Sequence, residues 1–137
     1  MIVNSLFRDG DMLVLRFSVK CLAAPAGGNC DGILNLAGDN GIPPFPGYKA
    51  QGGMTLRTPA AICLQDASGT DYAPVYTPQN GQPVTAETNQ FIGTASFPLW
   101  AYYPAPPPSV TSMTVVMPNA LSKIPGVPIS NALPAPP

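Results

Sequence analysis

The residues that most often carry acid, base or metal chemistry are scarce in this sequence. It contains no histidine, which is the commonest general base and the commonest protein ligand of transition metals. Pairs of Ser or Cys with His are therefore impossible as nucleophiles. Paired carboxylates remain, but all of the acidic residues except Glu87 lie near Gly, Ser or Asn in turn-like contexts: Asp9, Asp11, Asp31, Asp39, Asp66 and Asp71. We predict no catalytic pair among them, no enzymatic activity and no cofactor.

Oxygen ligands in loops are what a Ca²⁺ site requires. Two groups of side chains offer them: Asp31, Asn35, Asp39 and Asn40 in one long loop, and Asp66 and Asp71 around another. Neither group has the spacing of an EF-hand. The alternative is that these side chains form Asx-type turns by accepting hydrogen bonds from their own backbone. We favour the turns and predict no metal site.

The three cysteines are Cys21, Cys30 and Cys63, an odd number without Cys-x-x-Cys spacing. Zinc and thioredoxin-like chemistry are therefore weak interpretations. In an exported protein, Cys21 and Cys30 would close a short loop, which leaves Cys63 as a small buried hydrophobic residue. A bond between Cys21 and Cys63 is the rival pairing, and in a reducing compartment all three are buried thiols.

Aromatic residues gather late in the chain among prolines. They are Phe97, Trp100, Tyr102 and Tyr103. Rings beside prolines can bind extended peptides, sugars or a protein partner. The other interpretation is that the rings cover the open end of the fold. We favour the second and keep these four residues as the candidate binding surface.

The charge of the chain excludes one class of partner and favours certain surroundings. Charged residues make up 9% of the sequence and the formal net charge is −1. The basic residues are scattered, so nucleic acid is not expected as a partner. A surface with so little charge suits the outside of the cell or an assembly of neighbouring copies. Residues 88–122 are uncharged but interrupted by prolines, so no membrane span is expected.

Alternating apolar residues indicate the elements that must position these side chains. Residues 11–20 alternate as a half-buried strand does, residues 2–7 form its partner, and Asp9-Gly10 is a tight-turn signal. Residues 23–53 read mostly as loop with a short apolar run at 33–36. Further strands are expected at 54–57, 61–65, 72–76, 91–97 (ended by Pro98), 110–117 and 123–129. The prediction is an all-β fold, an immunoglobulin-like antiparallel β-sandwich of about seven or eight strands.

Several phrases together resemble a known family. They are LFRDGDMLVL at 6–15, LQDASGTDYAPV at 64–75, and the stretch from FP at 97–98 through PPPSVTSMTV at 106–115 to VPI at 127–129. The chain resembles an Ig-like, telokin-like accessory domain of secreted actinobacterial envelope proteins, found alone or beside OmpA-like domains. The resemblance covers most of the chain outside 23–53 and implies fold and compartment; it carries no catalytic residues. This sequence shows neither an OmpA-like domain after it nor an export signal before it.

These observations lead to one domain at residues 1–130 and a Pro-rich tail or linker at 131–137. The first functional hypothesis is a non-enzymatic module of the cell envelope that contacts a protein or a wall component. The second is a virion protein, such as a capsid decoration or a tail component, whose Pro-rich tail lies on a neighbouring copy. The third is a sugar-binding or hydrolytic domain.

Overall fold

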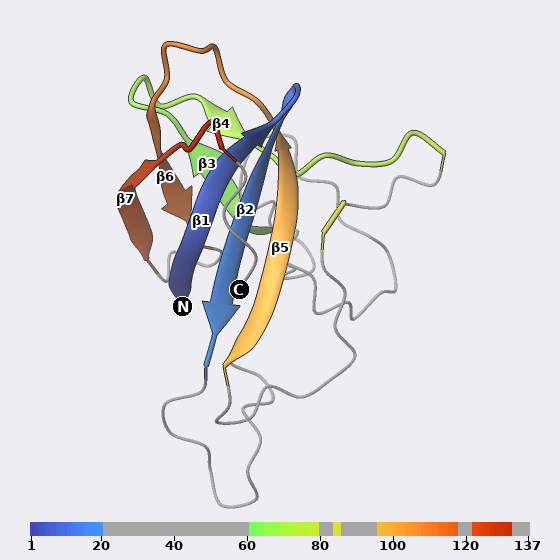
Figure 1. The fold of residues 1–137 in the computed structure, drawn as a ribbon, viewed down its shortest axis with the longest axis vertical. Helices are drawn as coiled ribbons and strands as arrows, with labels where there is room; N and C mark the ends of the chain where they lie inside the picture. The colour runs from blue at the N-terminus through green and yellow to red at the C-terminus, as the bar shows by residue number, and fades with distance from the viewer. Residues whose placement is uncertain (21–60, 80–83, 86–95, 118–121, 133–137) are drawn as a thin grey trace, which may run out of the picture.

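The described part of the chain consists of strands arranged in two antiparallel sheets (Figure 1). This computed structural model describes residues 1–20, 61–79, 84–85, 96–117 and 122–132. The strands are β1 (Ile2–Asp9), β2 (Met12–Val19), β3 (Cys63–Gln65), β4 (Asp71–Tyr72), β5 (Phe97–Pro104), β6 (Ser112–Val116) and β7 (Lys123–Pro128). The strand predicted at 54–57 and the short apolar run at 33–36 lie outside these ranges, as do residues 91–95 of the strand predicted at 91–97. Within the described ranges, no helix has the length and apolar character needed to cross a membrane.

The N-terminal hairpin confirms the prediction from alternation. β1 pairs with β2, and the pair closes at Asp9 and Met12. Gly10 has a φ of 59°, which suits a tight turn because glycine has no Cβ to clash. The loop residues are Gly10 and Asp11, one position later than the expected Asp9-Gly10.

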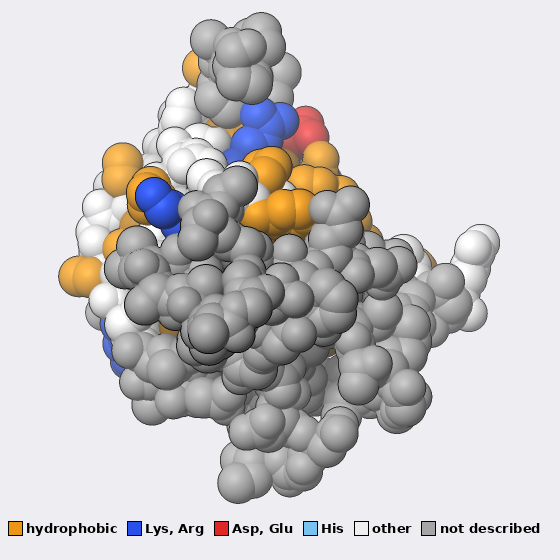
Figure 2. All heavy atoms as spheres, turned by 90° about the horizontal axis from the view of Figure 1, so that it is seen from below, with side chains coloured by type: hydrophobic (Ala, Val, Ile, Leu, Met, Phe, Trp, Pro, Cys, Tyr) orange, Lys and Arg blue, Asp and Glu red, His pale blue; other side chains and the backbone are white. Residues whose placement is uncertain are grey.

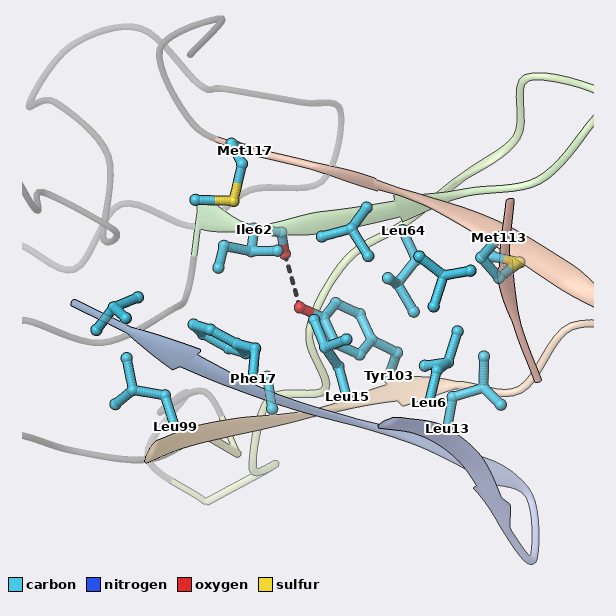
Figure 3. Packing of buried hydrophobic residues seen from close by; sticks show 14 residues of the cluster. Leu6, Leu13, Leu15, Phe17, Ile62, Leu64, Leu99, Tyr103, Met113 and Met117 are labelled. Atoms are coloured by element: carbon cyan, nitrogen blue, oxygen red, sulfur yellow. Dashed lines mark hydrogen bonds between the residues drawn. The ribbon is translucent and has the colours of Figure 1, made fainter. Parts of the chain in front are cut away.

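Two layers face each other across one apolar cluster. The first sheet has the order β1-β2-β5 and the second the order β4-β3-β6-β7. Alternate residues of β2 point into the cluster, as predicted for 11–20, and meet side chains of the second sheet such as Leu64 and Met113 (Figure 3). The all-β, sandwich-like architecture expected from the sequence is therefore confirmed.

The prediction that Pro98 ends a strand is wrong, because β5 begins at Phe97 and continues through Pro98 to Pro104. The backbone N–H and C=O of Tyr102 bond to Val84 and Val75, away from β2. Backbone groups of alternate residues in a strand point to the same side of it. Pro98 and Pro104 alternate with Tyr102, so their nitrogens, which carry no hydrogen, also face away from β2. The ladder between β2 and β5 runs through all eight pairs without a register shift.

The strand predicted at 72–76 is shorter than expected. β4 contains Asp71 and Tyr72, and the chain then leaves the second sheet. Pro74, which has no N–H for a ladder, follows two residues after Tyr72. The Val75 N–H donates to the Tyr102 carbonyl of the first sheet over 2.8 Å. The chain thus crosses from one sheet to the other where a longer strand was expected.

A second crossing lies where β7 ends. The Ile129 N–H donates to the carbonyl of Thr111, the residue before β6 of the second sheet, over 2.8 Å. The next residue, Ser130, bonds to the outer edge of β1: its N–H donates to the Leu6 carbonyl and its carbonyl accepts from the Arg8 N–H, each over 2.9 Å. Residues 129 and 130 therefore join the two layers along one side.

Arg8 also holds the proline-rich loop that follows β5. Its guanidinium donates to the carbonyls of Pro106, Pro107 and Val110 over 2.9, 3.1 and 3.3 Å. A segment rich in proline has few backbone N–H groups of its own, so most of its carbonyls depend on donors from elsewhere. Arg8 provides that donor and fixes the loop against β1.

Candidate functional site

The aromatic residues singled out from the sequence do not form one group, because β5 alternates between two faces. Tyr103 points into the core and is fully buried, and its hydroxyl donates to the Ile62 carbonyl over 3.0 Å (Figure 3). Phe97 is half-buried and packs against the same core cluster. Trp100 and Tyr102 lie on the opposite face of the sheet. The structure thus brings together Trp100 and Tyr102 and separates them from Phe97 and Tyr103.

Trp100 and Tyr102 form an edge-to-face pair. Their ring centroids are 5.7 Å apart and their planes are perpendicular. This is the arrangement that the quadrupoles of two aromatic rings favour. Trp100 is 40% exposed, and in the described ranges it is the one exposed aromatic side chain among the large hydrophobic residues. The pair is therefore fixed in position while part of the indole remains accessible.

Arg16 is the residue of this surface that the sequence analysis missed. It lies directly opposite Trp100 in the ladder between β2 and β5. Its guanidinium carbon is 5.1 Å from the centroid of the buried Phe7 ring on β1, a cation–π contact. The alternation along β2 predicts that Arg16 points outward, but its aromatic neighbours come from two other strands. We call Phe7, Arg16, Trp100 and Tyr102 the outer surface.

The polar residues of the outer surface are exposed or half-buried: Arg16 and Trp100 are exposed and Tyr102 is half-buried. Within the described residues, no side-chain hydrogen bond occupies the Trp100 indole, the Tyr102 hydroxyl or the Arg16 guanidinium. All three can donate hydrogen bonds, and only the Tyr102 hydroxyl can also accept one. Seen from below, the described part of the molecular surface is mostly hydrophobic or uncharged, with a few charged side chains (Figure 2). The outer surface offers rings, donors and one positive charge.

The loop around Asp66 is a turn of the kind favoured from the sequence. One carboxylate oxygen, Oδ1, accepts from the backbone N–H groups of Ser68 and Thr70 over 2.9 and 3.0 Å, and from the Ser68 hydroxyl over 2.6 Å. The Tyr72 hydroxyl donates to the other oxygen over 3.2 Å. These bonds, led by that of the Ser68 hydroxyl, lower the pKa of Asp66. The carboxylate therefore organises its own loop.

The second acid of that loop, Asp71, is bonded within the sheet. Its Oδ1 accepts from the Gln65 side-chain amide over 2.9 Å. Among the described residues, no group of three or more His, Cys, Asp or Glu side chains is placed to hold a metal ion. The other proposed ligands, Asp31, Asn35, Asp39 and Asn40, lie outside the described residues.

Cys63 is a buried free thiol, so the rival pairing with Cys21 is not made. Its sulfur lies 3.9 Å from Oδ1 of Asp71. Burial, and next the negative charge of Asp71, raise the pKa of Cys63 to about 12. The proposed disulfide between Cys21 and Cys30 lies outside the described residues.

Cys63 is expected to be almost unreactive toward alkylating agents in the native protein. At pH 8 the raised pKa lowers its thiolate fraction about 1000-fold relative to a thiol of pKa 9.0. Timed exposure to iodoacetamide, followed by mass spectrometry of the Cys63 peptide, measures the rate. Protein unfolded in urea at the same pH serves as the control and should react at the rate of a free cysteine. Equal rates in the two states would contradict the buried placement.

No protein-family model matches the sequence, and neither a curated protein nor a solved structure matches it.

Proposed function

We propose that this chain is a non-enzymatic binding module that contacts a protein partner through its outer surface. The observation that carries the proposal is the combination of Trp100, Tyr102 and Arg16 on one face of a regular sheet. Trp, Tyr and Arg are the residue types that most often dominate the energy of protein interfaces. Rings fixed by their neighbours lose little conformational freedom on binding.

The chemistry of the outer surface supports binding rather than catalysis. Its residues contain no carboxylate, thiol or imidazole that could accept a proton near neutral pH. The donors of Trp100 and Arg16 are suited to backbone or side-chain carbonyls of a partner. A surface of this composition binds and orients, and it leaves the partner chemically unchanged.

The two-sheet arrangement is compatible with an Ig-like sandwich, and the resemblance in sequence favours the cell envelope as its location. The virion is the alternative setting. The proposed contact is the same in both, because it depends on the sheet and its rings rather than on the compartment. Domains of this architecture commonly act as rigid carriers of an interaction surface.

Site-specific photo-crosslinking tests the proposal. Benzoylphenylalanine is introduced at position 100, and at the exposed Ser109 as a matched control away from the outer surface. In the organism that makes the protein, we expect a crosslinked protein of defined mass from position 100 and none from position 109. Mass spectrometry identifies the partner.

Trp100→Ala should then weaken binding of that partner at least tenfold, about 1.4 kcal/mol or more. Unfolding in urea should show a native stability close to that of the unchanged protein. No crosslink at position 100, or an affinity that survives the substitution, would refute the proposal. Sedimentation with purified peptidoglycan that depends on Trp100 would replace the protein partner by a wall component.

A further inference from the structure

The outer surface carries a positive charge that no described residue balances. Arg16 is exposed, and its guanidinium carbon lies 5.1 Å from the centroid of the Phe7 ring. A ring attracts a cation and holds it in place, but it does not neutralise the charge. Within the described ranges, Arg16 forms neither an ion pair nor a side-chain hydrogen bond. Its N–H donors can therefore bind another molecule.

The described acidic residues lie away from this charge. Asp9 is on the same face of the first sheet, opposite Met12, and Arg16 follows Met12 by four positions along β2. Four positions of a strand span about 13 Å, whereas physiological salt screens exposed charges beyond about 8 Å. The other described acids lie in the hairpin turn or at the second sheet: Asp11, Asp66 and Asp71. The described part of the chain thus provides no carboxylate for Arg16.

Lys20 adds a second positive charge at the end of the same strand. It is exposed and follows Val19, the last residue of β2. It too has no ion pair with any residue that the structure describes. Along β2, the described acids lie at the hairpin end, and the described cations follow toward the other end.

A partner that binds Trp100 also covers Arg16. The two residues are directly opposite each other in the ladder between β2 and β5, the two adjacent strands of the first sheet (Figure 1). Such pairs hold their Cβ atoms about 5 Å apart, whereas an ordinary interface covers about 800 Å² of each protein. The partner therefore removes water from the guanidinium. Burial of a charge is unfavourable unless an opposite charge pairs with it.

We infer that the partner presents an Asp or Glu side chain whose carboxylate pairs with Arg16 beside the Trp100 indole. This inference rests on the proposed function, because it names the chemistry of the partner bound there. The planar guanidinium matches both oxygens of a carboxylate. The Trp100 N–H and the Tyr102 hydroxyl lie on the same face of the sheet and provide further donors. A Lys or Arg of the partner at this place would be repelled.

Random linear peptides displayed on phage are the first probe. Peptides are selected on the immobilised protein and then tested on Trp100→Ala, which identifies those that depend on the outer surface. We expect the Trp100-dependent peptides to be enriched in Asp and Glu, and depleted in Lys and Arg, relative to the unselected library. Their binding should weaken as the salt concentration rises, because salt screens the attraction.

A synthetic peptide of this set then shows which cation its carboxylate contacts. Replacement of its acidic residue by the corresponding amide should lower its affinity for the unchanged protein at least about tenfold. The same replacement should matter less than about twofold for Arg16→Gln, because the carboxylate has then lost its partner. Fluorescence anisotropy of the labelled peptide measures these affinities.

Lys123→Gln is the matched control. It removes the same charge from an exposed position on β7 of the second sheet. In this variant the replacement in the peptide should keep its full effect. Urea unfolding of Arg16→Gln and Lys123→Gln should show that both variants remain folded under the conditions of the binding measurements.

Two results would overturn the inference alone. The first is a set of Trp100-dependent peptides no richer in Asp and Glu than the library. The second is an acidic peptide whose amide replacement has the same effect on Arg16→Gln as on Lys123→Gln. Failure to select any Trp100-dependent peptide would instead count against the proposed function, and against this inference with it.

Discussion

Tyr103→Ala should lower the free energy of unfolding by about 3–5 kcal/mol, and Tyr103→Phe by about 1–3 kcal/mol. The ring is fully buried between the layers, so its removal leaves a cavity. The smaller change removes only the hydroxyl that donates to the Ile62 carbonyl, which then lacks that donor in the interior. Equilibrium unfolding in urea at pH 7 measures both losses. A Tyr103→Phe variant as stable as the parent would show that this bond contributes nothing.

Alkaline pH separates the hydroxyl's contribution from simple packing. Burial raises the pKa of Tyr103 well above its usual value of 10.0. The stability that depends on the protonated hydroxyl is therefore present below pH 10 and is lost as pH rises further, because the unfolded state then releases its proton. The advantage of the parent over Tyr103→Phe should shrink above pH 10. Tyr72 titrates in both proteins, so its effect cancels in the difference, whereas Cys63 interacts with Tyr103 and contributes to the difference.

Arg8→Ala should cost about 2 kcal/mol, the second large effect. Charge-assisted hydrogen bonds are stronger than neutral ones, but these are partly exposed and are discounted accordingly. Arg8→Lys should lose most of the same stability, since one ammonium group cannot reproduce the spread of the guanidinium fork. Urea unfolding measures the loss. Faster hydrogen exchange at the Val110 amide, which bonds to Pro107 over 2.9 Å, should accompany it.

Arg16→Ala is the matched control for Arg8→Ala. It removes the same side chain from the neighbouring strand, where the guanidinium contacts the Phe7 ring instead of backbone carbonyls. A cation–π contact at an exposed site is worth about 0.5–1 kcal/mol. Equal losses for the two substitutions would contradict the role assigned to Arg8 in holding the proline-rich loop.

The N-terminal hairpin could be predicted because its signals are local. Leu13, Leu15 and Phe17 alternate with outward residues, and Gly10 supplies the turn conformation. The continuation of β5 through Pro98 could not be predicted in the same way. Whether a proline interrupts a ladder depends on the side to which its missing N–H points, and pairing with the distant β2 decides this.

The candidate site shows the same division between local and long-range information. Alternation along residues 97–103 separates Trp100 and Tyr102 from Tyr103, although it does not say which face is buried. Arg16 joins the outer surface only through the register of β2 with β5, and Phe7 only through that of β1 with β2. Alternation alone can therefore place single residues on the outer face of a strand. Which of these residues lie together in the outer surface depends on how β1, β2 and β5 pair.

The joining of both layers by residues 129 and 130 has a consequence for synthesis on the ribosome. β1 and β2 emerge first, but β2 cannot find β5 until residues 97–104 have been made, and the edge of β1 receives Ser130 later still. The nascent polypeptide must therefore keep an apolar hairpin uncovered during most of its translation. Formation of the native state should be slow and late, as expected when contacts join opposite ends of a chain.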